Sequence, residues 1–338
     1  MSDRPAKPPK RLSEFDMIAR YFAPLTRDLP SSLGHAFDLK DDAALLRVPK
    51  NKELVITKDA LVADVHFFSS DDPSLVARKL IRVNLSDLAA KGATPLGYLL
   101  SLSLPHNIES AWVKAFAAGL KKDQKEFGFH LLGGDTTATS GPISLVLTAL
   151  GLVRKGKMIR RKGAKAGDDI YLTGTLGDAV LGLSVARNEP SQLALKDAAY
   201  LLSRYRLPQP RVAFGAKLSS LANAAIDISD GLKADLGHLC EVSEVACVIE
   251  VEALPLSKPA RRALTEDPAW AARLITGGDD YELLFTAPKN QRAALLRAAQ
   301  ATKTPLTRIG GVERGRGCRF LLAGGKALRV EASGYRHF

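Results

Sequence analysis

The sequence lacks the features of a membrane protein and of a secreted, disulfide-bonded protein. Among its 338 residues, no apolar run approaches the roughly 20 residues that cross a bilayer. Three cysteines, Cys240, Cys247 and Cys318, show no metal-binding or redox spacing, and their odd number favours reduced thiols. Residues 1–12 contain prolines and basic residues but no apolar signal-peptide core, so we expect a disordered basic tail. We therefore expect a cytoplasmic protein without a membrane partner.

Aromatic residues are also few, at 6% of the chain, and this limits what the net charge of +12 can mean. One basic cluster, residues 154–165, contains seven Lys and Arg residues and no acidic residue. Few aromatic side chains accompany the basic ones, so little surface is offered on which bases could stack. A small anionic substrate explains the charge more simply, and we expect no nucleic-acid partner.

Several catalytic motifs are missing as well. The chain has no Walker lysine loop, no protein-kinase catalytic-loop motif and no convincing Ser-His-Asp or Cys-His arrangement. These absences exclude the best-known routes to nucleophilic catalysis and to nucleotide binding through a lysine loop.

The length and composition predict two globular domains. The chain is 46% apolar and 25% charged, and 338 residues suffice for two hydrophobic cores. The basic, glycine-containing segment 154–167 is the best boundary between them. We expect an N-terminal domain over residues 13–153 and a C-terminal domain over residues 154–338.

Residues 82–93 form the stretch around which the rest of the chain is organised. Leu85 and Leu88 share a face at helical spacing, which predicts a short buried helix that ends at Gly92. Asp87 lies within this pattern. A carboxylate removed from water needs a cation or several hydrogen-bond donors.

Other aspartates occur, like Asp87, at the edges of apolar runs. Four segments carry them: Asp41-Asp42, residues 55–59, residues 131–135 and residues 225–230. Taken alone, Asp41-Asp42 is more typical of a polar turn. Together, these carboxylates are the ligand type of a hard cation, and we expect them to converge on magnesium ions around a nucleotide.

Glycines accompany two of these aspartate segments. Gly133-Gly134 follows a strand predicted over residues 129–132, and residues without Cβ let a backbone approach a ligand closely. Asp230-Gly231 ends a strand predicted over residues 224–229 and could form a corner for metal and phosphate. A plain turn explains the first segment equally well, and a capped helix start explains the second.

Phosphoryl transfer is the chemistry that such a carboxylate set can support. It depends mostly on positioning and charge neutralisation, with little covalent help from the protein. The aspartates therefore predict metal-assisted phosphoryl transfer.

Two helices are predicted from their patterns alone. Residues 13–22 are amphipathic, with Ser13 as a possible cap and Pro24 as the stop. Residues 110–127 form a longer amphipathic segment that ends at Gly128.

Six motifs in this sequence resemble, in their order, those of the thiamine-monophosphate kinase family. They are Asp41-Asp42-Ala43, residues 59–62 with His66, residues 84–93, Gly133-Gly134-Asp135-Thr136, residues 227–232 and residues 277–283. The resemblance runs from about Ser13 to the C-terminus. It implies an ATP-dependent kinase that converts thiamine monophosphate to thiamine diphosphate.

The resemblance also implies a fold, a dimer and a site. The fold is the α/β (α+β) two-domain fold shared with aminoimidazole ribonucleotide synthetase, with an N-terminal sheet that pairs across a homodimer and a C-terminal α/β domain. The magnesium ligands it implies are Asp41, Thr57, Lys58 (through its backbone), Asp59, Asp87, Asp135, Asp227 and Asp230, of which Asp41, Asp87 and Asp227 are taken as catalytic. ATP would contact Gly134, Asp135, Arg161 and Ser229, and the substrate would contact His66, Asp279 and position Ala332.

Three positions depart from the family pattern. Leu39-Lys40 stands where the family has a glycine before Asp41, Asp279 replaces a glutamate, and Ala332 replaces an aromatic residue. These departures leave two alternatives: an ATP-using enzyme of the same superfamily with a changed substrate, or a nucleotide-binding regulator without catalysis.

Overall fold

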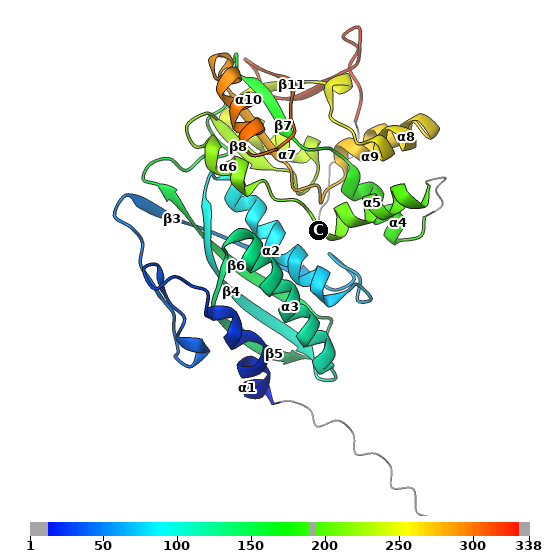
Figure 1. The fold of residues 1–338 in the computed structure, drawn as a ribbon. Coiled ribbons are helices and arrows are strands. Elements are labelled where there is room, and N and C mark those ends of the chain that lie inside the picture. The colour runs from blue at the N-terminus through cyan, green and yellow to red at the C-terminus, as the bar shows by residue number, and fades with distance from the viewer. Residues whose placement is uncertain (1–12, 190–193, 331–338) are drawn as a thin grey trace, which may run out of the picture. The chain divides into compact units, whose positions relative to one another are not determined.

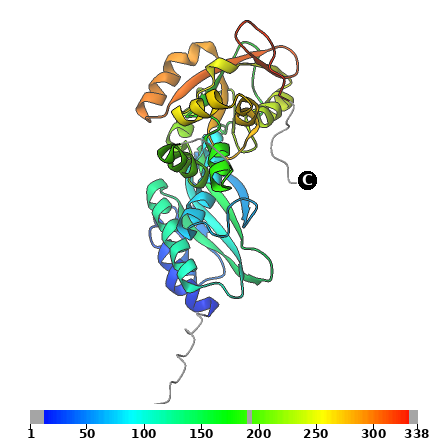
Figure 2. The same ribbon diagram turned by 90° about the vertical axis from the view of Figure 1, so that its right-hand side faces the viewer.

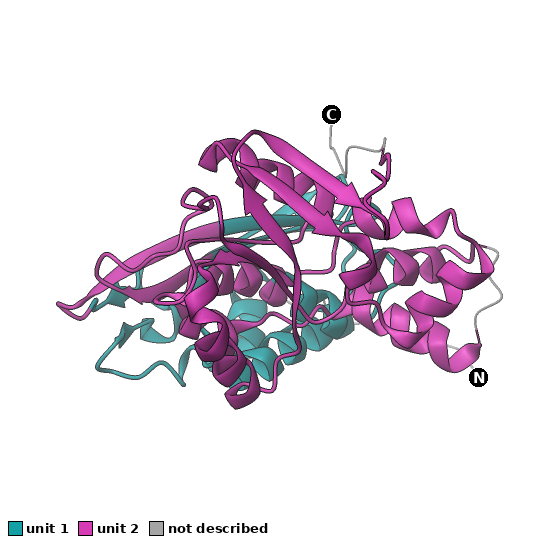
Figure 3. Cartoon of the chain, turned by 90° about the horizontal axis from the view of Figure 1, so that it is seen from above, with its two compact units in different colours: residues 1–48, 58–80, 97–148 teal, residues 49–57, 81–96, 149–338 magenta. Residues whose placement is uncertain are grey.

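The computed structural model describes residues 13–189 and 194–330. The tail predicted over residues 1–12 and position Ala332 lie outside the described residues. The chain divides into two compact units, which Figure 3 colours separately. Of the described residues, the first contains 13–48, 58–80 and 97–148, and the second contains 49–57, 81–96, 149–189 and 194–330. None of the described helices is long and apolar enough to span a bilayer.

A four-stranded sheet with the order β3–β6–β4–β5 is the framework of the N-terminal part. Its strands are β3 (Lys52–Val62), β4 (Thr94–Pro105), β5 (His130–Thr139) and β6 (Ser144–Arg154). Helix α3 (Ser110–Phe127) lies along one face of the sheet in both views of the ribbon (Figures 1 and 2). Gly128 ends α3 in the left-handed conformation, so the helix predicted over residues 110–127 is confirmed.

The first helical segment differs from its prediction. Ser13 caps α1 (Glu14–Met17), but the chain then passes into a π-helix (Ile18–Phe22) and a 3-10 helix (Ala23–Thr26). Pro24 stands at the start of the 3-10 helix, where its missing N–H costs nothing. The prediction of one α-helix over residues 13–22 was wrong beyond its first turn. Two short strands, β1 (Gly34–His35) and β2 (Leu45–Leu46), and a 3-10 turn (Phe37–Leu39) follow.

The central stretch is the C-terminal part of a longer helix. Residues 82–90 form the second half of α2 (Pro73–Ala90), an 18-residue helix. Gly92 follows it at φ +71°, a conformation that favours glycine, so the predicted end is confirmed. Leu85 and Leu88 are fully buried, as expected.

A six-stranded sheet with the order β12–β9–β11–β7–β10–β8 organises the second unit. Its strands are β7 (Asp169–Thr173), β8 (Ala224–Asp227), β9 (Ala246–Glu250), β10 (Leu283–Ala287), β11 (Leu306–Glu313) and β12 (Gly317–Leu321). The helices are α4 (Asp178–Ala186), α5 (Leu195–Arg206), α6 (Val212–Leu218), α7 (Leu232–Ser243), α8 (Lys258–Glu266), α9 (Trp270–Thr276) and α10 (Arg292–Ala301).

Strand β7 is buried on both faces and divides the core of this unit into two layers. Ile170 and Leu172 belong to a cluster that includes the apolar face of α7. Tyr171 points the other way and packs with Phe214 of α6 and Phe285 of β10. Because successive side chains of a strand alternate between faces, this five-residue strand supplies both cores.

Candidate functional site

Asp87 is held by a hydroxyl from a neighbouring strand. In the second unit, the Thr57 hydroxyl of β3 donates a hydrogen bond of 2.5 Å to Oδ2 of Asp87 in α2. Asp87 is partly exposed, although the residues around it in α2 are buried. The pair therefore offers a carboxylate and a hydroxyl oxygen, both hard donors, side by side.

Asp227 is the most deeply buried of the candidate metal ligands. It ends β8, and only 4% of its surface is exposed. Burial, and then the nearby charge of Asp87, raises the pKa of Asp227 to about 6, while a hydrogen bond from Ser86 and the charge of Lys91 lower it. Two carboxylates thus act on each other in a poorly hydrated place, as expected where a cation has to bind.

Lys91 supplies a resident positive charge close to these carboxylates. Its ammonium group donates to the backbone carbonyl of Ala225 at 3.0 Å. Burial lowers the pKa of Lys91, whereas the negative charges of Asp227 and Asp87 raise it. The lysine therefore offsets part of the acidic charge around Asp227.

The corner after β8 is fixed by an aspartate that the sequence analysis did not assign. Asp235, in the first turn of α7, accepts hydrogen bonds of 3.1 Å from the backbone N–H groups of both Ser229 and Asp230. Burial, followed by the charges of Asp227 and Asp230, raises the pKa of Asp235 to about 8. Because β8 ends at Asp227, Ser229 lies beyond the strand, and the prediction of a strand over residues 224–229 was wrong for its last two residues.

A loop that leads into β10 lies against this corner. The N–H of Asp279 donates to the carbonyl of Ser229 at 2.9 Å, and a Cβ on Gly278 would lie 2.2 Å from the same carbonyl oxygen. The Ser86 hydroxyl also lies 3.4 Å from the carbonyl oxygen of Tyr281. The loop that contains Asp279 is therefore in contact with the segment that contains Ser229 and Asp230.

In the first unit, a second group of candidate site residues lines a cavity of about 480 Å³. Asp41, Asp42, Gly134 and Asp135 line it together with apolar residues of β4 and the π-helix. The two neighbouring aspartates are exposed, and Oδ1 of Asp41 accepts the N–H of Asp42 at 2.8 Å. One cavity thus combines an acidic rim with an apolar wall.

Gly134 is needed for packing between two strands. Strand β5 does not end at Leu132 as predicted but continues through Gly133, Gly134 and Asp135. Gly134 pairs with Leu100 of β4, and a Cβ at this position would lie 1.8 Å from the Leu100 carbonyl oxygen. A register shift in the β4–β5 pairing occurs just before the glycines. Neither a turn nor a ligand is required to explain the glycine.

The remaining candidates of the first unit lie on and just after β3. Lys58 and Asp59 are strand residues, the first exposed and the second partly exposed. The N–H of Val62 donates to Nδ1 of His66 at 3.1 Å. Since Nδ1 accepts, the imidazole is neutral and carries its proton on Nε2. The backbone at the end of β3 therefore orients the His66 ring.

Some candidates are not gathered into a complete metal site. Arg161 is exposed, and its carbonyl accepts a hydrogen bond from Ser243. Over residues 13–189 and 194–330, no three Asp, Glu, His or Cys side chains are grouped closely enough to hold a metal ion. Thr57, Asp87 and Asp227 nevertheless provide oxygen donors and an excess of negative charge, which fits a hard cation such as magnesium.

Comparison with known proteins identifies the family. The chain matches the AIR synthase related protein family over residues 40–153 (N-terminal domain) and 165–322 (C-terminal domain). It is 40% identical to the thiamine-monophosphate kinase of Escherichia coli K12, over 96% of this chain and 98% of the relative. The chain belongs to the thiamine-monophosphate kinase family.

Solved structures agree with this assignment. The thiamine-monophosphate kinase of Stenotrophomonas maltophilia has a TM-score of 0.78 and 42% identity, covering 86% of this chain and 91% of that one. AaThiL complexed with AMPPCP and TMP has a TM-score of 0.76 and 34% identity, covering 88% and 91%. The expected α/β, two-domain fold is therefore confirmed, and it is built on two main sheets.

Proposed function

We propose that the chain transfers the γ-phosphate of ATP directly to the phosphate of thiamine monophosphate and so forms thiamine diphosphate. The observation that carries this proposal is the sequence identity of about 40% between this chain and thiamine-monophosphate kinases, over nearly their whole length. A 34%-identical relative complexed with AMPPCP and TMP supports the same pair of substrates.

We propose magnesium as the metal. Its ligands in the second unit would be Thr57, Asp87, Asp227 and Asp230, and its ligands in the first unit would be Asp41, Lys58 (backbone), Asp59 and Asp135. When bound, magnesium neutralises the charge on two anionic substrates and on the transferring phosphoryl group. The raised pKa of Asp227 supports this assignment, because a bound cation stabilises a carboxylate that is buried and lies close to a second carboxylate.

The protein groups would bind and orient the two substrates. The cavity with Gly134 and Asp135 has an acidic rim suited to metal-bound phosphates and an apolar wall suited to a base. Ser229 and Arg161 would contact ATP, and His66 and Asp279 would contact thiamine monophosphate.

No general base is required. The acceptor is a phosphate whose second pKa of about 6 leaves it largely ionised at neutral pH. A positioned anion can attack without losing a proton, so the reaction depends on alignment and on electrostatic stabilisation.

The active form is proposed to be a homodimer that pairs through the N-terminal sheet. In the described residues β5 is an edge strand, since β4 is its only neighbour in that sheet, and residues 134, 135, 137 and 138 are exposed. An exposed edge strand is a template for pairing with a second chain. Light scattering with size-exclusion chromatography would test this, and a monomer at assay concentrations would refute it.

Asp87→Asn tests the reaction and the metal site together. With ATP, magnesium and thiamine monophosphate, the wild type should form thiamine diphosphate, and the variant should lose about 100-fold or more in rate. Asp267→Asn is the matched control, because Asp267 is exposed and its carboxylate accepts the N–H of Ala269 two residues away. A wild type that binds ATP but forms no product would refute the proposed reaction. A variant with the wild-type rate would refute the role of Asp87.

A further inference from the structure

The loop between α9 and β10 has an unusual backbone. Asp279 and Tyr281 both adopt positive φ, +69° and +50°, although neither is glycine. Such conformations are unfavourable for residues with a side chain and persist only when the surroundings enforce them. Two backbone hydrogen bonds contribute, from Asp279 N–H to Ser229 and from Tyr281 N–H to Ile228.

Asp280, between these two residues, anchors the loop to a helix terminus. It is 2% exposed, and its two oxygens accept the N–H of Gly177 at 2.6 Å and of Ala179 at 3.1 Å. These N–H groups lie at the start of α4, where helical donors have no partner within the helix. The Asp280 side chain is therefore directed into the protein.

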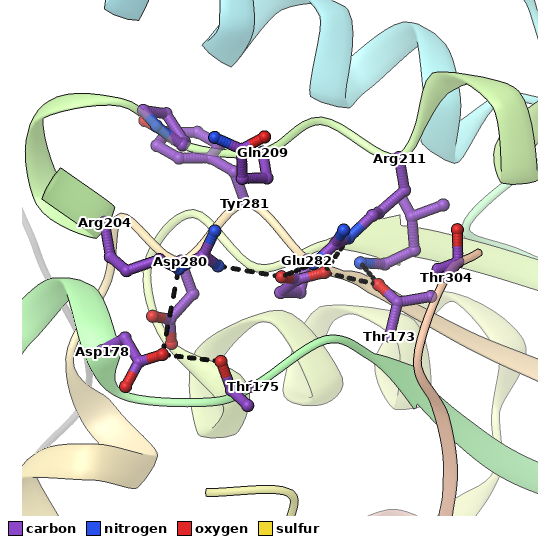
Figure 4. A network of polar contacts seen from close by, with 12 residues as sticks. Thr173, Thr175, Asp178, Arg204, Gln209, Arg211, Asp280, Tyr281, Glu282 and Thr304 are labelled. Atoms are coloured by element: carbon purple, nitrogen blue, oxygen red, sulfur yellow. Dashed lines mark hydrogen bonds and ion pairs between the residues drawn. The ribbon is translucent and has the colours of Figure 1, made fainter. Parts of the chain in front are cut away.

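Glu282 provides a second and stronger anchor, shown in Figure 4. It is fully buried, and its carboxylate accepts from the Thr173 hydroxyl at 2.8 Å and from Arg204 at 2.9 Å. Arg211 binds it through two nitrogens, at 2.6 and 2.5 Å. A bidentate arginine fixes direction as well as distance.

The partners of Glu282 come from three different segments. Thr173 ends β7, Arg204 lies in the last turn of α5, and Arg211 directly precedes α6. The side chains of Arg204 and Arg211 are only 10% and 19% exposed. The loop is therefore tied at both sides of Tyr281 to the body of the second unit.

We propose that Asp280 and Glu282 are positioning residues that hold Asp279 in the conformation in which it contacts thiamine monophosphate. Asp280 lies between the two positions of positive φ, and Glu282 directly follows the second. Because both side chains are buried and hydrogen-bonded, they fix the backbone of the loop, and with it Asp279, in one conformation. The inference rests on the proposed contact between Asp279 and the acceptor. It assigns to the clamp a role in acceptor binding and none in ATP binding.

Glu282→Gln tests the clamp, because it keeps the shape of the side chain and removes the charge that the two arginines need. We expect the KM for thiamine monophosphate to rise on the order of tenfold or more. The Kd for AMPPCP should remain within about twofold of the wild-type value. Arg211→Lys, which replaces the two-pronged contact by a single ammonium, should give a smaller rise in the same KM and serves if the first variant does not fold.

Asp169→Asn is the matched control. Asp169, the first residue of β7, is also a buried carboxylate bound by two arginines, Arg292 of α10 and Arg308 of β11. This variant should lower the melting temperature without changing the KM for thiamine monophosphate. If Glu282→Gln and Asp169→Asn change that KM equally, or if Glu282→Gln weakens AMPPCP binding as much as acceptor binding, the clamp has no specific role and the inference fails.

Asp279→Ala separates this inference from the proposed function. If Asp279→Ala raises the KM for thiamine monophosphate and Glu282→Gln does not, the clamp is wrong and the acceptor contact stands. If Asp279→Ala leaves that KM unchanged, the proposed contact itself is wrong, and the clamp inference falls with it.

Discussion

Each end of strand β7 has its own carboxylate that is bound by two arginines. The two ends differ in how deeply these arginines are buried. At its first residue, Asp169 accepts hydrogen bonds from Arg292 and Arg308, whose side chains are 51% and 40% exposed. Beside its last residue, Thr173, Glu282 is bound by arginines that are only 10% and 19% exposed.

The same chemical grouping therefore has different consequences at the two ends. At the Asp169 end, hydrogen bonds from the arginines hold the pKa of Asp169 at about 2, and water can solvate the arginines if the carboxylate is removed. At the Glu282 end, Asp280 and Asp178 are buried as well, and burial raises the pKa of Asp280 to about 8. Removing Glu282 leaves Arg211 without its carboxylate partner in a poorly solvated place, whereas Arg204 keeps an ion pair with Asp178 at 3.8 Å.

Replacing each carboxylate residue by alanine should give the largest difference in stability between the two ends of β7. We expect Glu282→Ala to lower the free energy of unfolding by about 3–5 kcal/mol, because two largely buried arginines lose their shared partner. Asp169→Ala should cost about 1–3 kcal/mol, since its arginines can turn toward water. Urea unfolding of both variants beside the wild type measures the difference. Equal losses would show that burial of the arginines does not decide the outcome.

A methyl group added at each end provides a second test, with a smaller effect. A Cβ at Gly278 is not tolerated on the present backbone, because it would lie 2.2 Å from the Ser229 carbonyl oxygen. At Gly311, which pairs with Asp169, the nearest atom is 3.7 Å away. We expect Gly278→Ala to cost about 1–3 kcal/mol and to raise the KM for thiamine monophosphate. Gly311→Ala should change stability by less than about 1 kcal/mol and leave the KM unchanged. A neutral Gly278→Ala would contradict the close packing of the loop.

The two ends also show what the sequence could and could not predict. The helix over residues 110–127 and the glycine that ends α2 were predictable because periodicity and helix caps are local signals. The partners of Glu282 lie 71, 78 and 109 residues away along the chain, so no local pattern indicated them. Asp280 and Glu282 were recognised only as parts of a motif, without a role.

The residue types of the candidate site could be predicted from the sequence, but much of its geometry could not. Asp87 and Asp227 were both expected to belong to one group of converging carboxylates, and the charge of Asp87 does raise the pKa of Asp227, after burial. The pair Gly133-Gly134 predicted a turn or a ligand contact, because glycine is most often needed where φ is positive. Here the need comes from the Leu100 carbonyl of the neighbouring strand, which only the register of β4 and β5 reveals. Asp235 was missed because its role, accepting two backbone N–H groups, depends on how α7 turns back on the corner.

The pH dependence of stability should give the smallest effect, and it tests directly whether the arginines stabilise the charge of Asp169. The pKa of Asp169 is about 2 in the folded chain, below the roughly 3.9 of an unfolded aspartate. A depressed carboxyl pKa stabilises the folded state fully above the unfolded value, and this stabilisation is lost as the pH falls through the folded value. We therefore expect the difference in unfolding free energy between the wild type and Asp169→Asn to be constant from about pH 7 to 5 and to shrink between about pH 4 and 2. Urea unfolding of both proteins at about pH 6, 4 and 3 measures it. A difference that stays constant down to the lowest of these pH values would mean that the arginines do not stabilise the charge of Asp169, and the contrast between the two ends would lose its electrostatic basis.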